Sequence, residues 1–67
     1  MKTILFKNGD LALVKWVKGD HEEFVVVRLL TKDLDKSEGD EVNEWAYGSY
    51  HYDFNSGLQA FMKKCLI

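Results

Sequence analysis

The sequence contains one cysteine, no proline and no excess of basic residues. A single cysteine excludes an intrachain disulfide. Domains of this size often add a disulfide, a metal or a partner subunit, because their cores are small. For one domain spanning residues 1–67, self-association is therefore the added stabilisation that we expect. The net charge of −2 also argues against a nucleic-acid module, which usually shows a basic excess.

The chain also lacks a long apolar run. No stretch approaches the roughly 18 apolar residues of a membrane span, and the apolar N-terminal run stops at Lys7, as a signal peptide would not. The sequence predicts a soluble, cytoplasmic protein with no membrane partner.

What is present is a long β-hairpin over residues 11–30. β-branched and aromatic residues dominate both of its halves, and these residue types favour strands. Gly19 and Asp20 between them suit a two-residue type II′ turn. That turn predicts the cross-strand pairs Lys18–His21, Trp16–Glu23, Val14–Val25 and Ala12–Val27.

Three further segments flank this hairpin. Residues 3–7 predict a short strand, which a type I′ turn at Asn8–Gly9 would join to the hairpin, pairing Phe6 with Leu11 and Ile4 with Leu13. Residues 31–41 are polar and acidic and predict a long mobile connection. Residues 42–52 predict a fourth strand, in which Gly48 indicates a bulge or a close approach by another element.

Residues 54–67 predict the one helix. Ser56 and Gln59 match a capping box, with Asn55 or Asp53 as alternative caps. The helix would present one apolar stripe, made by Leu58, Phe61, Met62 and Cys65. The expected fold class is therefore α+β: a four-stranded antiparallel β-meander with one C-terminal helix packed on one face, in the order β-β-β-β-α.

One helix covers one face of such a sheet. We expect it to lie on the face that carries Leu5, Ala12, Val14, Trp16, Val25, Val27 and Leu29. The opposite face is also apolar, and contiguous exposed apolar patches usually mark an interaction site. The candidate partner-binding residues on that face are Phe6, Leu13, Lys15, Phe24, Val26, Arg28, Trp45 and Tyr47. The alternatives are that the 31–41 connection or the N-terminus covers this face, or that the register differs.

An aromatic cluster of six residues lies between positions 45 and 54: Trp45, Tyr47, Tyr50, His51, Tyr52 and Phe54. Trp and Tyr dominate protein-binding hot spots, and sheet aromatics can also stack nucleic-acid bases. The third interpretation is that every second residue of this segment fills the core. Strand alternation would put Ala46, Gly48, Tyr50 and Tyr52 under the helix, and Trp45, Tyr47 and His51 on the open face.

No motif predicts catalysis, a metal site or a cofactor. Asp33, Asp35, Ser37 and Glu44 resemble calcium-loop spacing, but Gly39 is one place too late and the flanks read as strands. Cys65 lies near a helix C-terminus, which does not favour a thiolate, and the two histidines are too few for a zinc site.

Two functions remain. The first is a small non-enzymatic protein-interaction module of regulator or inhibitor type, which self-associates through the apolar face or binds another protein there. The second is single-stranded nucleic-acid binding through Trp45, Tyr47, Lys15 and Arg28.

Overall fold

The computed structural model describes residues 1–66 and has an α+β fold. Its four strands are β1 (Lys2–Asn8), β2 (Leu11–Lys18), β3 (His21–Leu29) and β4 (Trp45–His51). They form one antiparallel sheet in the order β1-β2-β3-β4, followed by helix α1 (Phe54–Cys65). A 3₁₀ turn, η1 (Thr31–Asp33), lies in the connection between β3 and β4. The β-β-β-β-α order and the single C-terminal helix are as predicted.

The register of the central hairpin is the predicted one. β2 and β3 pair Lys18 with His21 and continue without a shift to Leu11 and Arg28. Gly19 has a φ of +60°, as the first central residue of a type II′ turn requires. The faces of β2 and β3 therefore follow from the sequence alone.

The first hairpin differs from its prediction in two ways. Its turn is Gly9–Asp10 rather than Asn8–Gly9, so Asn8 pairs with Leu11. A type I′ turn needs positive φ at both central residues, but only Gly9 has one. A register shift between Ile4 and Phe6 then places these two side chains on opposite faces, where the sequence predicted one.

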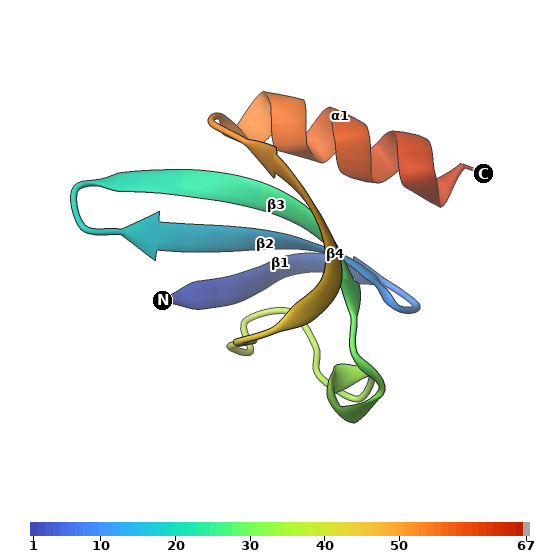
Figure 1. Cartoon of the computed structure of the whole chain (residues 1–67). Helices are drawn as coiled ribbons and strands as arrows, with labels where there is room; N and C mark the ends of the chain where they lie inside the picture. The colour runs from blue at the N-terminus through green and yellow to red at the C-terminus, as the bar shows by residue number, and fades with distance from the viewer. Residues whose placement is uncertain (67) are drawn as a thin grey trace.

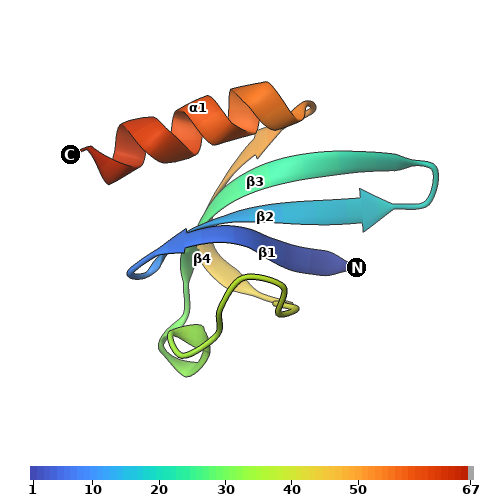
Figure 2. The ribbon, with the colours of Figure 1, turned by 180° about the vertical axis from the view of Figure 1, so that it is seen from behind.

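Helix α1 lies on the face that we expected to be open. Figures 1 and 2 show it above β2 and β3, with the 31–44 connection on the other side of the sheet. We call the face under α1 the helix side and the opposite face the loop side. The buried residues of the helix side are Leu11, Leu13, Phe24, Val26 and Phe61.

The loop side has its own core. Its buried residues are Ile4, Ala12, Val14, Val25, Val27, Leu29 and Val42. Val42, which the sequence predicted to begin the fourth strand, lies instead in the connection before β4, and its side chain is fully buried. The connection thus covers one face of the sheet and α1 covers the other.

The start of α1 is capped by Asp53, one of the predicted alternatives. Its carboxylate accepts a hydrogen bond from the Ser56 backbone N–H at 2.8 Å, which satisfies one of the free donors of the first turn. The apolar stripe includes Leu58, Phe61 and Cys65 as predicted, but Met62 is 55% exposed. Ile67, to which the predicted helix extended, lies outside the described residues.

Candidate functional site

The predicted partner-binding residues do not form one open surface. Leu13, Phe24 and Val26 are at most 6% exposed, because α1 packs on them. Phe6 keeps 43% of its surface exposed and lies beside Phe61, with ring centroids 6.5 Å apart. The expectation of an uncovered apolar face was therefore wrong: the chain itself supplies the cover.

The two predicted cations of this face are each paired with an acidic side chain. Lys15 lies 3.5 Å from Glu22, and Arg28 lies 2.8 Å from Asp10. These four side chains are all substantially exposed to solvent, so each pair adds little to stability.

Trp45 and Tyr47 were predicted to share a face and do not. Tyr47 pairs with Arg28 and Trp45 with Leu29, across a register shift in β4. Because Arg28 and Leu29 are neighbours in β3, they point to opposite faces. Tyr47 therefore lies on the helix side and Trp45 on the loop side. Lys15 and Arg28 are thus separated from Trp45, which weakens the proposed nucleic-acid surface.

The loop side carries a cluster of three aromatic residues at one end of its core. Trp16 packs edge-on against Trp45, with centroids 5.8 Å apart, and lies 6.4 Å from Tyr50. The Trp45 indole N–H donates a hydrogen bond to the Tyr50 hydroxyl at 3.4 Å. We call these three residues the Trp–Tyr cluster.

Gly48 makes this cluster possible. A Cβ atom at Gly48 would lie 2.9 Å from the Trp45 Nε1 atom and 3.0 Å from the Tyr50 ring. The two side chains can therefore meet over the Gly48 backbone only because it has no side chain. The sequence predicted a bulge or a close approach by another element at Gly48. The register shift of β4 lies instead between Trp45 and Tyr47, and the side chains that approach Gly48 come from its own strand.

Two lysines lie against the same cluster. The Lys18 ammonium is 3.9 Å from the centroid of Trp16, and the Lys2 ammonium is 4.5 Å from it and 5.2 Å from that of Trp45. Such contacts between a cation and an aromatic face are attractive. No sequence pattern predicts this arrangement, because Lys2, Trp16 and Trp45 come from three separate strands.

All three tyrosines of the chain are exposed, and all lie on or beside β4. Tyr47 is 74%, Tyr50 51% and Tyr52 83% exposed. Tyr47 and Tyr50 are on opposite faces of β4, and Tyr52 follows the strand directly. The prediction that Tyr50 and Tyr52 lie beneath the helix was therefore wrong. We call Tyr47, Tyr50 and Tyr52 the tyrosine surface.

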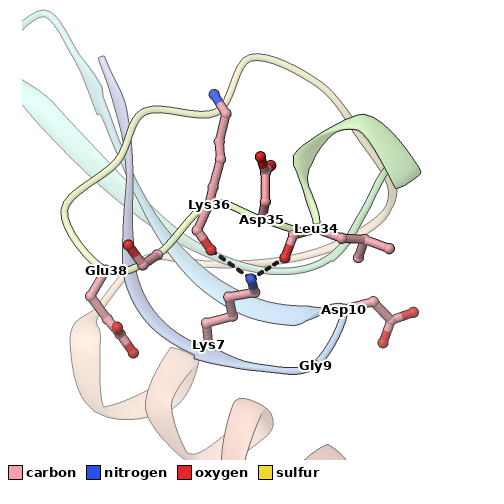
Figure 3. A pocket seen from close by; sticks show the side chains of 8 residues that line it. Lys7, Gly9, Asp10, Leu34, Asp35, Lys36 and Glu38 are labelled. Carbon is pink, nitrogen blue, oxygen red and sulfur yellow. Dashed lines mark hydrogen bonds between the residues drawn. The ribbon is translucent and has the colours of Figure 1, made fainter.

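A shallow hollow separates the β1–β2 turn from the connection (Figure 3). The Lys7 ammonium donates hydrogen bonds to the backbone carbonyls of Leu34 and Lys36. The carboxylates that line the hollow, from Asp10, Asp35 and Glu38, point in different directions. No group of three or more His, Cys, Asp or Glu side chains that could hold a metal ion occurs in residues 1–66. Lys7 thus binds to the backbone of the segment that has the calcium-loop spacing and holds that segment against β1.

One hydroxyl–imidazole pair occurs on β4. The Ser49 hydroxyl and the His51 Nε2 atom are 2.9 Å apart, a distance compatible with a nucleophile and its base. A catalytic histidine is usually oriented by a third group, but within residues 1–66 no carboxylate is hydrogen-bonded to His51. Cys65 is half-buried against the helix-side core. Neither the Ser49–His51 pair nor Cys65 therefore forms a recognisable catalytic arrangement.

No family model, no curated protein and no solved structure matches this chain. No helix in the described part of the chain is long and apolar enough to cross a membrane. Function is therefore inferred from the geometry of the surface alone.

Proposed function

We propose that this protein is a small non-enzymatic interaction module that binds a protein partner through the tyrosine surface. The observation that carries the proposal is the exposure of all three tyrosines, two of them in β4 and the third directly after it. Tyrosine is enriched in binding hot spots because its large, rigid ring adds contact area while its hydroxyl stays hydrogen-bonded.

The charge distribution around this surface favours a protein over a nucleic acid. β4 carries no Lys, Arg, Asp or Glu. The nearest cation in register, Arg28, is already held by Asp10. Affinity for nucleic acid comes mainly from cations that contact phosphates. Lys64 of α1 lines a hollow with Tyr47 and Arg28, which falls short of the basic patch that a nucleic-acid module usually presents. Protein interfaces instead have an aromatic centre depleted in charge.

The test is a double substitution, Tyr47→Ser with Tyr52→Ser, which removes two exposed rings. Its matched control is Leu34→Ser with Met62→Ser, at positions 42% and 55% exposed away from β4. Affinity capture from extracts of the encoding cell identifies proteins retained by the parent and the control but lost with the double variant. A retained protein is then purified and titrated calorimetrically.

We expect the tyrosine variant to bind the purified partner at least about tenfold more weakly, since one hot-spot residue is worth more than about 1 kcal/mol. Equal binding by the parent, the tyrosine variant and the control would refute the proposal. Salt-sensitive binding of a single-stranded oligonucleotide, lost with the same two tyrosines, would instead favour the nucleic-acid function.

A further inference from the structure

The sheet has two edges, and the chain covers only one of them. Along β1, the Ile4 N–H donates to the Asp40 carbonyl at 2.9 Å, and the Val42 N–H donates to the Lys2 carbonyl at 3.0 Å. The Gly39 N–H donates in turn to the Ile4 carbonyl at 2.8 Å. Within residues 1–66, no backbone hydrogen bond joins β4 to any segment except β3. The outer edge of β4 is therefore unpaired.

The register identifies which backbone groups this edge presents. In an antiparallel pair, each strand's residues bond alternately to one neighbouring strand and to the other. The Leu29 N–H donates to the Asp10 carbonyl, at the β2 end of the hairpin. Arg28 and Val26 consequently bond toward β4, to Tyr47 and Ser49. Gly48 and Tyr50, which alternate with these, direct their N–H and C=O groups outward.

This edge lacks the features that usually prevent strands from pairing between molecules. Natural edges carry charged residues, prolines or bulges that block another strand. β4 has no charged residue and no proline, and its only register shift lies at its first end, between Trp45 and Tyr47. From Tyr47 to His51 the strand is regular and uncharged.

We propose that the partner at this edge is a second copy of the chain, with β4 paired antiparallel to β4 of that copy. Gly48 of each copy then exchanges both backbone hydrogen bonds with Tyr50 of the other, and the two Ser49 residues meet at the twofold axis. The two four-stranded sheets become one continuous sheet. This inference rests on the proposed function in one respect: the dimer brings the exposed tyrosines of both copies together at the joined edges, with Tyr47 on one face of the continuous sheet and Tyr50 on the other.

The absence of charge on β4 favours a second copy as the occupant. In a strand that pairs with itself about a twofold axis, the residues at and beside the axis lie near their own copies, and like charges placed there are destabilising. In this register Tyr47 lies opposite His51 of the second copy, an aromatic pair that adds to sheet stability. A partner strand of different sequence would have no such need for a neutral edge.

Two measurements on the intact chain test the inference. Light scattering behind a sizing column gives the mass across a concentration series. Amide hydrogen exchange at low and high concentration then locates the contact. We expect a dimer in which the Gly48 and Tyr50 amides exchange at least about tenfold more slowly than at dilution, whereas the Asp20 amide in the β2–β3 turn is unchanged.

Cross-linking tests the register. With Cys65 replaced by alanine, Ser49→Cys should form an intermolecular disulfide under mild oxidation, because residues facing each other at the axis have Cα atoms within bonding range. Ser37→Cys, in the exposed connection, is the matched control and should cross-link much more slowly.

Three results would overturn the inference: a monomer at all concentrations, a dimer without protection at Gly48 and Tyr50, or protection that appears only when another protein is added. A monomer that still binds a partner through Tyr47 and Tyr52 would leave the proposed function standing. Because Tyr47 also lies opposite His51 of the second copy, the mass of the double tyrosine variant is measured alongside its partner binding.

Discussion

α1 approaches the sheet closely at Gly57, a residue without a side chain. A Cβ atom at Gly57 would lie 2.8 Å from the Phe24 Cβ and 3.3 Å from the Leu13 Cδ1. The Phe24 Cβ is fixed to the strand backbone, so it cannot swing aside as the end of a long side chain could. The spacing between helix and sheet is therefore set by Gly57.

Substitution of Gly57 by alanine should destabilise the protein by about 1 kcal/mol. Alanine is the better helix former by about 1 kcal/mol, but overpacking a core contact costs about 1–3 kcal/mol. Denaturant titration measures the change, with Asn55→Ala, at an exposed position of the same helix, as the control. A Gly57→Ala protein as stable as the parent would show that the helix can move away at no cost.

At the scale of elements, two register shifts account for most of what the sequence could not predict. The strands, their order and the central hairpin register follow from residue type and turn chemistry. The shifts near Leu5 and Ala46 each reverse the alternation of side chains, and neither residue carries a compositional signal for a bulge. This is why Ile4 and Phe6 separate, and why Trp45 and Tyr47 separate as well.

The start of the fourth strand was also misjudged: the sequence placed Val42 in it, but β4 begins at Trp45 and Val42 lies in the connection between β3 and β4. Val42 completes the loop-side core, while the hydrogen bonds from Lys7 to Leu34 and Lys36 hold the first half of the segment. The sequence could not choose the helix face for a related reason: both faces of β2 and β3 are apolar, so the hydrophobic pattern fits either placement.

Replacing Lys7 by methionine should loosen this connection. The substitution keeps the apolar stem and removes the ammonium donor, at a cost of about 1–2 kcal/mol for two lost hydrogen bonds near the surface. The Gly39 and Val42 amides, which bond to β1, should then exchange faster. Lys32→Met is the control, since Lys32 only approaches the exposed Glu44 at 3.5 Å. Unchanged exchange in Lys7→Met would show that the β1 hydrogen bonds suffice.

At the scale of the whole molecule, the chain covers both faces of its own sheet. The helix-side residues Leu13 and Val26 and the loop-side residues Val14 and Val25 are all buried within one chain. The apolar face that the sequence assigned to a partner therefore stabilises the monomer fold. β4 is the strand that remains for recognition. It contributes no fully buried side chain to either core, its tyrosines are exposed, and its outer edge is unpaired.

A matched pair of valine substitutions distinguishes a self-covered sheet from a partner-covered one. Val26 is 3% exposed beneath α1, whereas Val17, near the end of β2, is 40% exposed and opposite Glu22. Val26→Lys should unfold the chain, because an unpaired buried charge costs several kcal/mol. A domain of this size has a total stability of only about 3–10 kcal/mol. Val17→Lys should fold normally, since its ammonium stays in water beside a carboxylate. Circular dichroism and thermal unfolding measure both. If the Val26→Lys chain were a folded, soluble monomer, α1 could not be the element that covers this face.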